Sequence, residues 1–434
     1  MSSASCSSFN SHVITKLENL IWARIVLKRH NMNLEHVLLV SNEIGKLRKQ
    51  IPFEVQKQLN CQDTRIRTYF KRAFVRWIFN AIRKSKNPFT EVIRASDFVS
   101  ESDVTYFFEK NANLRVKSSL IKSSSVELDW SWLDAYFQRV HQLSMPRAER
   151  KLEVFRQEAV VFKYASRMHS ISLKQYENAK RLYTGDPNEL DARVMMLLSR
   201  YDACGTTKNH CSVPPQMVKY INAKTELFGS PFNTCTSQYC SPFYDLEKDF
   251  GSLGSFFDLS SLFDLGEVEP RQVVYGKVRE GASRLMFKGQ PTTPSELQTG
   301  GGACPHMQTG AYLMNPPYDE EFMQEAMLRV ISSLKSKREI TVIVVIPMWD
   351  AKSQEVHKGR VFARNDFQAL ETAEKSGFVR SQAVLSHASH KFYDYYKDQM
   401  VAVADAHLLV MSNTRYNLTA NQIADEWAHI TSVN

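Results

Sequence analysis

The spacing of apolar residues divides the chain into two parts. Before residue 228, apolar residues recur at helical spacing in several separate segments. Helices are predicted over 13–29, 35–47, 64–82, 133–143, 146–165, 173–183, 189–201 and 215–228, and short strands over 104–109 and 113–116. The first part is therefore expected to be a mainly helical domain over 13–228, after a disordered Ser-rich N-terminus over 1–12.

From residue 311 the pattern alternates between strands and helices. Residues 340–347 form a continuous β-branched run, which is typical of a buried parallel strand. The other predicted elements are a strand at 311–314, helices at 322–334, 367–375 and from about 420, and strands at 378–385 and 400–411. The fold class is therefore α/β, and the last two strands are expected to pair antiparallel at the sheet edge.

The segment between these two patterns is rich in turn-forming residues. Residues 260–309 are expected to be a flexible insertion, in which 272–278 could form a strand. The run Gly300-Gly301-Gly302 has no Gly-Lys-Ser/Thr ending and no helix pattern after it, so it does not predict a phosphate-binding loop.

Composition limits the class of protein without fixing its function. The 434 residues allow two domains, and a net charge of +9 fits a polyanionic partner, although many other proteins are equally basic. The seven cysteines contain no Cys-x-x-Cys pair, so neither a metal site nor a disulfide framework is expected. The first residues lack a secretory pattern and no apolar run is long enough for a bilayer, so an intracellular protein without a membrane is expected.

The tetrapeptide Asn315-Pro316-Pro317-Tyr318 carries the clearest chemical signal. The strand before it would deliver it to the carboxyl edge of the sheet, where open α/β folds bind ligands. The two prolines remove backbone donors and hold Asn315 extended. The Asn315 side-chain oxygen and the Pro316 carbonyl could then accept both hydrogens of an adenine amine, while the base stacks on Tyr318. The alternative is an ordinary Pro-Pro turn between a strand and a helix.

Four stretches extend this signal. They are Val161-Phe162-Lys163-Tyr164 through Arg200-Tyr201, Leu227-Phe228-Gly229 through Ser241, Asp249-Phe250-Gly251-Ser252-Leu253-Gly254, and Asn315 to Tyr318 with Ile346-Pro347-Met348-Trp349. Together, over about 160–411, they resemble the catalytic region of the phosphorylated-CTD-interacting-factor family, the cap-specific adenosine N6-methyltransferases. The resemblance implies a Rossmann-like methyltransferase domain over 229–434, whose antiparallel last strands are common in methyltransferase-like sheets, and S-adenosylmethionine as cofactor.

The resemblance also implies roles for individual residues. The reaction would be methylation of N6 of the first transcribed adenosine next to the 7-methylguanosine cap of RNA, with Asn315 to Tyr318 as the catalytic motif. The cofactor side would be lined by Ser230, Pro231, Asn233, Phe250, Gly251, Ser252, Gly254 and Asp258. Gly251 and Gly254 would permit close backbone approach, as in a strand-to-helix glycine turn. Asp258 could bind a ribose hydroxyl, with Asp264 and Glu267 as competitors, and Trp349 could stack on a purine or fill the sheet edge.

Three departures from the family limit what is implied. Tyr318 stands where the family usually has Phe, Met348 replaces an acidic residue, and the insertion at 260–309 is additional. A WW-like domain with paired tryptophans is not visible in the sequence, so binding of the phosphorylated CTD by that route is not implied.

The predicted helix at 64–82 is basic and aromatic, as a surface that follows a phosphate backbone would be. Arg65, Arg67, Arg72 and Trp77 are its candidate RNA contacts, and the alternative is an amphipathic helix with a solvated basic side. Capped RNA beginning with adenosine and the transcription machinery are the expected partners, in the nucleus or also in the cytoplasm. Two other functions stay open, namely methylation of internal RNA or DNA adenines and a catalytically inactive cap- or RNA-binding protein.

Overall fold

The computed structural model describes residues 33–111, 121–122, 125–143, 151–205, 211–257, 310–317, 319–335, 339–349 and 368–433. The predicted elements at 13–29, 113–116 and 272–278, the insertion at 260–309, and the candidate residues Asp258 and Tyr318 lie outside these ranges.

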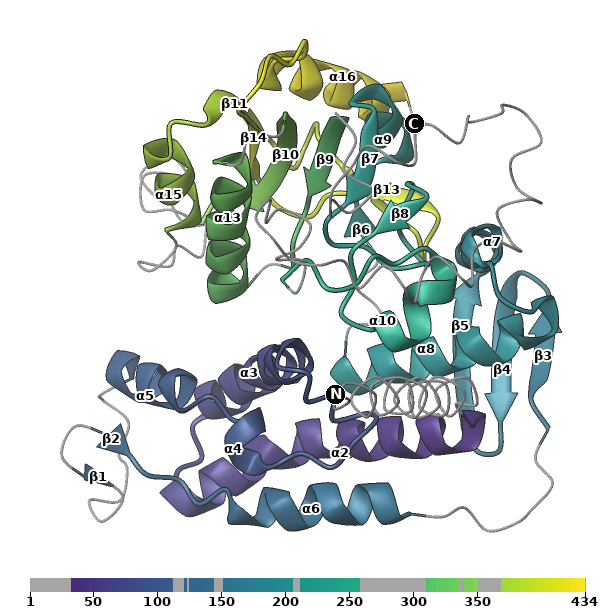
Figure 1. Ribbon diagram of the computed structural model, residues 1–434, viewed down its shortest axis with the longest axis vertical. Coiled ribbons are helices and arrows are strands. Elements are labelled where there is room, and N and C mark those ends of the chain that lie inside the picture. Colours follow the sequence, from purple (N-terminus) through teal and green to yellow (C-terminus); the bar gives the residue numbers. More distant parts are fainter. Residues whose placement is uncertain are drawn as a thin grey trace, which may run out of the picture. The chain divides into compact units, whose positions relative to one another are not determined.

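The chain divides into two compact units (Figure 1). The first unit comprises Met1–Ile78, Lys86–Lys151 and Met195–Gly205, and the second comprises Phe79–Ser85, Leu152–Val194 and Thr206–Asn434. Two of the boundaries, after Ile78 and after Val194, fall inside helices.

The first unit is mainly helical. Its elements are α2 (Leu34–Leu59), α3 (Thr64–Arg83, to Ile78), α4 (Ala95–Phe98), α5 (Glu101–Lys110), β1 (Ile121–Lys122), β2 (Ser125–Val126), α6 (Ser131–Gln142) and the part of α8 (Leu190–Cys204) from Met195. Helix α2 begins at Asn33, whose side chain accepts from the Glu35 N–H, and it ends at Asn60 in the left-handed conformation. The helices predicted at 35–47, 64–82 and 133–143 are therefore confirmed, although α2 is longer than predicted.

Two sequence predictions in the first half were wrong. A helix replaces the predicted strand at 104–109, because Ser100 caps α5 by accepting from the Asp103 N–H. The predicted helix at 146–165 is replaced by an antiparallel meander of β3 (Glu153–Arg156), β4 (Ala159–Tyr164) and β5 (Arg167–Ser172). In β4, buried Val160, Phe162 and Tyr164 alternate with more exposed residues, and this period of two outweighs the helix-start signal of Pro146.

The second unit contains, besides this meander, a six-stranded sheet in its described residues. The sheet consists of β7 (Ala223–Glu226), β8 (Gln238–Tyr239), β9 (Gly310–Met314), β10 (Ile340–Pro347), β11 (Val379–Leu385) and β14 (Ala406–Ser412). Its order is β11-β14-β10-β9-β7-β8. Neighbouring strands from β10 to β8 are parallel, whereas β14 pairs antiparallel with both β10 and β11. The prediction of an antiparallel pair at the edge is thus confirmed.

This unit also contains the last turn of α3 and several further elements. They are α7 (Leu173–Leu182), η2 (Pro187–Glu189), the start of α8, β6 (Cys211–Ser212), α9 (Pro215–Tyr220), α10 (Tyr244–Glu247), η3 (Lys248–Phe250), α13 (Glu320–Leu334), α15 (Ala369–Lys375), β12 (Phe392–Asp394), β13 (Gln399–Val401) and α16 (Ala420–Val433). The helix predicted at 215–228 was too long, because Asn222 adopts a positive φ and the chain continues into β7. The strand predicted at 400–411 is divided between β13 and β14.

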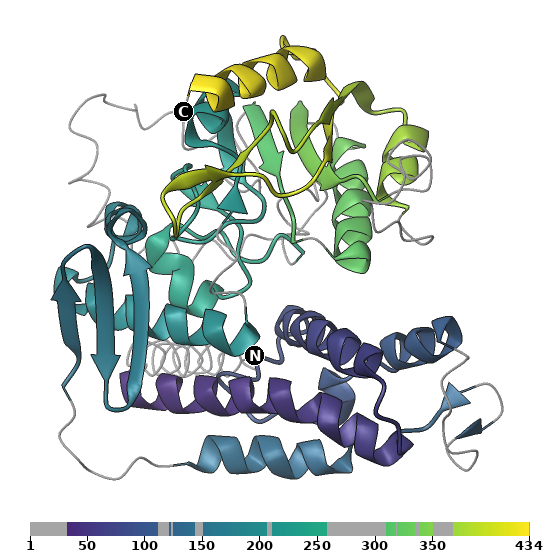
Figure 2. The same cartoon turned by 180° about the vertical axis from the view of Figure 1, so that it is seen from behind.

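Side-chain alternation along the central strands produces two cores. Val342, Val344 and Ile346 of β10 point into a core shared with α13 and α15. Ile343 and Val345 point into a second core shared with α9 and α16. Every residue of β10 is therefore buried, as its β-branched sequence predicts, and the sheet lies between two helical layers (Figures 1 and 2).

Among the described residues, no helix is sufficiently long and apolar to span a bilayer.

Candidate functional site

The candidate site lies at the carboxyl edge of the parallel strands in the second unit. The chain continues from β7 to β8 in one direction across the sheet and from β9 to β10 in the other. The order therefore reverses between β7 and β9, and ligands of open α/β sheets bind at such a reversal. Here the Leu227 N–H donates to the Leu313 carbonyl at 2.8 Å, so the loop after β7 and the motif after β9 begin side by side.

Asn315 is the first residue after β9 at this edge. It is half-buried, and its Oδ1 is shielded from solvent without a hydrogen-bond donor. A buried acceptor without a donor lowers the free energy of unfolding by about 1–3 kcal/mol, so this orientation of Asn315 destabilises the folded protein. Pro316 is buried and Pro317 is exposed, and Asp319 caps α13 by accepting from the Phe322 N–H. The strand, the two prolines and the helix cap together hold the Asn315 oxygen at the sheet edge.

The loop after β7 is fixed by its own side chains. Asn233 Oδ1 accepts from the Ser230 N–H and from Ser230 Oγ, each at 2.9 Å. Asn178 Nδ2 of α7 donates to the carbonyls of Pro231 at 3.0 Å and Thr234 at 2.8 Å. Ser230, Pro231 and Asn233 therefore lie at the predicted edge, but the Ser230 hydroxyl and the Asn233 carbonyl oxygen are used to shape the loop.

Glu226, the last residue of β7, is a further anchor of this loop that the sequence interpretation missed. Its carboxylate is fully buried, and Oε1 accepts from Thr234 Oγ1 at 2.7 Å, the Cys235 N–H at 2.6 Å and the Thr236 N–H at 3.3 Å. Burial raises the pKa of Glu226, and these hydrogen bonds act against that rise. The helix predicted at 215–228 included Glu226, so the end of a strand was not recognised there.

The pH dependence of stability is expected to report this buried carboxylate. Because the pKa of Glu226 is raised above 4.5, the folded state holds the proton more tightly than the unfolded state. Its contribution to the free energy of unfolding is therefore fully present below about pH 4.5 and is lost as the pH rises through the folded-state pKa. The Glu226→Gln variant keeps an oxygen for the same donors and cannot titrate. In urea denaturation from pH 4 to 7, we expect the wild type to lose stability relative to Glu226→Gln; a flat or increasing difference would contradict this.

The first residues of the predicted glycine turn pack into the fold. Gly251 follows η3 with φ of 91°, and a Cβ there would lie 2.5 Å from the Ser237 carbonyl oxygen. Phe250 is fully buried, with its ring 4.8 Å from that of Tyr183. These two residues therefore support the fold. The residues that would follow the turn, from 258 on, lie outside the described ranges, so the strand-to-helix turn stays a prediction.

The end of the turn does reach the carboxyl edge. Ser252 bridges in parallel to Tyr239 of β8, and the Ser241 N–H donates to the Gly254 carbonyl at 2.9 Å. Ser252 Oγ accepts from the Gly254 N–H at 3.2 Å and lies 2.9 Å from Ser241 Oγ. Gly254, with φ of 111°, thus joins the same edge as Ser230 and Asn315.

An aromatic cluster flanks the switch point. Phe228 after β7 lies 5.5 Å from Phe322 of α13, and Phe322 lies 4.7 Å from Phe257, between ring centroids. Phe79, at the end of α3, contacts Phe322 with centroids 6.1 Å apart. Arg83 pairs with Glu325 of α13 and lies over the Phe257 ring. The periodicity of α3 gave no signal that its last turn belongs with the second unit.

Trp349 lies two residues beyond β10 at the same edge. It is half-buried and packs against the core that α13 and α15 cover. Met348, one of the departures noted in the sequence, is buried. Trp349 therefore helps to fill the sheet edge, and its stacking on a purine stays a prediction.

The candidate RNA contacts of α3 lie in the first unit and have different environments. Arg72 is exposed, Arg65 pairs with Asp63 at 2.6 Å, and Arg67 donates from Nε to Gln56 Oε1 at 2.8 Å. Trp77 is fully buried, and its Nε1 donates to Asp103 Oδ2 at 2.7 Å. The prediction of Trp77 as an RNA contact was wrong, because its ring packs against other aromatic rings and presents no face to a base.

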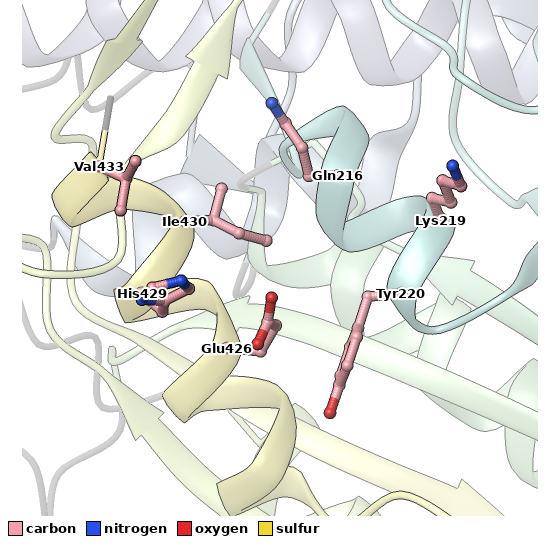
Figure 3. Close-up of a pocket in the computed structure, with 7 residues that line it drawn as sticks. All are labelled: Gln216, Lys219, Tyr220, Glu426, His429, Ile430 and Val433. Atoms are coloured by element: carbon pink, nitrogen blue, oxygen red, sulfur yellow. The ribbon is translucent and has the colours of Figure 1, made fainter.

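A separate pocket lies between α9 and α16 (Figure 3). Its volume is about 510 Å³, and its lining includes Lys219, Tyr220, Glu426 and His429. Helix α9 leads into the amino end of β7, so this pocket is not at the carboxyl edge. Among the described residues, no group of three or more His, Cys, Asp or Glu side chains could hold a metal ion.

A comparison with known protein families identified a match. Residues 173–271 match the family model described as the phosphorylated CTD interacting factor 1 WW domain. No curated protein matches the chain. The matched residues contain no tryptophan, and the described ones include α7, α8, β7, β8 and the glycine turn. The match therefore covers the loop after β7 and the residues that position it.

Proposed function

Because the chain belongs to the phosphorylated-CTD-interacting-factor family, we propose that it is an S-adenosylmethionine-dependent N6-methyltransferase. Its substrate is the first transcribed adenosine next to the 7-methylguanosine cap of RNA. The observation that carries this proposal is the buried Asn315 Oδ1 without a donor, at the switch point of the sheet. An adenine amine is a donor of the kind that this oxygen lacks.

The sheet supports a Rossmann-like methyltransferase domain. Five strands, β8, β7, β9, β10 and β11, run in one direction, and the antiparallel β14 lies between β10 and β11. The loop after β7, the end of the glycine turn and the Asn315 motif all reach one edge of this sheet. We propose that the mainly helical part of the chain contributes to binding of the capped RNA.

The residues at this edge fit a bound S-adenosylmethionine. The loop of Ser230, Pro231 and Asn233 is held in place by Glu226 and Asn178, and Gly254 has no side chain that would occupy the edge. In the proposal these residues bind the cofactor, and Asp258 binds its ribose. When bound, the cofactor supplies an electrophilic methyl group on a sulfonium.

The residues of the chain would orient the adenine amine for methyl transfer. Asn315 Oδ1 accepts one N6 hydrogen, the Pro316 carbonyl accepts the other, and Tyr318 stacks on the base. The nitrogen lone pair then faces the methyl group, so that catalysis comes mainly from orientation. A general base is not required, because the alkylated nitrogen is acidic enough to lose its proton to water.

Partners and localisation follow from this proposal. We propose capped RNA beginning with adenosine as substrate, contact with the transcription machinery as the family name suggests, and a nuclear location with some protein in the cytoplasm.

The deciding experiment compares capped and uncapped RNAs of the same sequence beginning with adenosine. With purified protein and S-adenosylmethionine, we expect N6-methyladenosine at the first position of the capped RNA, formed at least about tenfold faster than on uncapped RNA. Mass spectrometry of the released nucleosides measures the product. Equal rates on both RNAs would contradict cap specificity. Methylation of internal RNA adenines or of DNA adenines would favour an N6-adenine methyltransferase with that substrate. Absence of S-adenosylmethionine binding would indicate a catalytically inactive RNA-binding protein.

A further inference from the structure

A histidine–aspartate pair lies at the same carboxyl edge, outside the residues used above. His387 follows β11 and Asp405 precedes β14. His387 Nδ1 lies 2.6 Å from Asp405 Oδ1, and the His387 backbone N–H donates to the same oxygen at 2.7 Å. A carboxylate can only accept, so Nδ1 carries the hydrogen and Nε2 is the acceptor of the neutral ring. Two bonds to one oxygen fix the ring in a single orientation.

The imidazole is accessible on its other side. The His387 side chain is 45% exposed, whereas that of Asp405 is 16% exposed. Of the two ring nitrogens, only Nδ1 bonds to a residue that the structure describes. An oriented ring with an available Nε2 is suited to binding a ligand that donates a hydrogen bond.

Strand pairing places this ring near Trp349. The Met348 N–H donates to the Asp405 carbonyl at 3.0 Å, and Ala406 pairs with Pro347 on one side and Leu385 on the other. Trp349 and His387 thus follow two strands that flank β14, about 10 Å apart at the usual strand spacing. This separation suits a nucleotide whose base lies on Trp349 and whose sugar lies toward His387.

Hydrogen-bond chemistry distinguishes the groups that RNA could offer to Nε2. In its neutral form the ring offers Nε2 as an acceptor, and a phosphate oxygen has no hydrogen to donate to it. A ribose hydroxyl can donate to Nε2 without a charge, and the 2′-hydroxyl distinguishes RNA from DNA. We propose that His387 binds the 2′-hydroxyl of one of the first three transcribed nucleotides and that Asp405 is its positioning residue. This inference rests on the proposed RNA substrate.

The test is a double-mutant cycle between protein and RNA. Capped RNAs beginning with adenosine carry a single 2′-deoxy sugar at position 1, 2 or 3, and binding is measured by fluorescence anisotropy. At one position, we expect the deoxy sugar to weaken wild-type binding about five- to tenfold. His387→Ala should weaken binding of the all-ribose RNA by a similar factor and should then be insensitive to that deoxy sugar. Asp405→Asn should retain part of the sensitivity.

The matched control is His429→Ala, an exposed histidine of α16 at the pocket in Figure 3, which should bind like the wild type. Additive losses at all three positions would overturn the contact. A His387→Ala loss that is equal for ribose and deoxyribose RNAs would indicate a phosphate contact and also overturn it. Methylation is measured in parallel. If the RNA is methylated but the effects of His387→Ala and of the deoxy sugar are independent, only the contact is refuted. If the two effects depend on each other but no methylation occurs, the contact is supported and the proposed function is refuted.

Discussion

Asn315→Ala is expected to lower kcat for methylation of capped RNA beginning with adenosine by at least about a thousandfold, or about 4 kcal/mol of transition-state stabilisation. The variant removes the acceptor that holds the amine, so the nitrogen lone pair is no longer aimed at the methyl group. The affinity for S-adenosylmethionine should change by less than about threefold, since Asn315 is not among the proposed cofactor contacts.

Two further variants distinguish loss of the Asn315 hydrogen bond from a general effect of substitution on the enzyme. Asn315→Asp keeps an acceptor oxygen and should retain more activity than Asn315→Ala. Asn188→Ala changes an exposed asparagine of η2 and should leave kcat unchanged. Single-turnover methylation and cofactor binding by calorimetry measure these quantities. An Asn315→Ala enzyme that is as active as the wild type would remove Asn315 from the mechanism.

Trp77→Ala is expected to destabilise the protein by about 3–5 kcal/mol, as large-to-small changes of buried aromatic residues do. Trp77 is fully buried, and its ring makes edge contacts with Phe70, Phe98 and Trp130. Its removal leaves a cavity and also takes the indole donor away from the buried Asp103.

Urea denaturation measures this loss, with Arg72→Ala on the exposed side of the same helix as the control. The control should change stability by no more than about 0.5 kcal/mol. Trp77→Phe should be intermediate, because it keeps an aromatic ring but no donor for Asp103. If Trp77→Ala were as stable as Arg72→Ala and instead lost RNA affinity, the assignment of Trp77 to the core would be wrong.

The sequence predicted best what depends on local periodicity. The β-branched run of β10, the helical face of α13 and the position of Asn315 just after β9 all follow from residues that are adjacent in the chain. Trp77 was also predictable as a core residue. Phe70, Phe74, Trp77 and Ala81 recur at helical spacing and are all fully buried, so this stripe competes directly with the basic side of α3.

Other features depend on register and therefore escape local patterns. Glu226 meets donors from residues 234–236 because the loop after β7 turns back on it, and His387 meets Asp405 because β14 lies beside β11. The β3–β4–β5 meander was missed because a helix-start signal was given more weight than the alternation in β4. The last turn of α3 joins the second unit through Phe79 and Arg83, which a one-dimensional pattern does not reveal.

The position of β14 has a consequence for biosynthesis. Among the described strands it is the last in sequence, yet it lies between β10 and β11. During translation, β10 and β11 leave the ribosome with the edges that β14 later covers still unpaired. A chain halted before residue 406 therefore carries exposed apolar strand edges, which are sites for aggregation. The sheet, and with it the edge that holds Asn315, is completed only when the segment that forms β14 has been made.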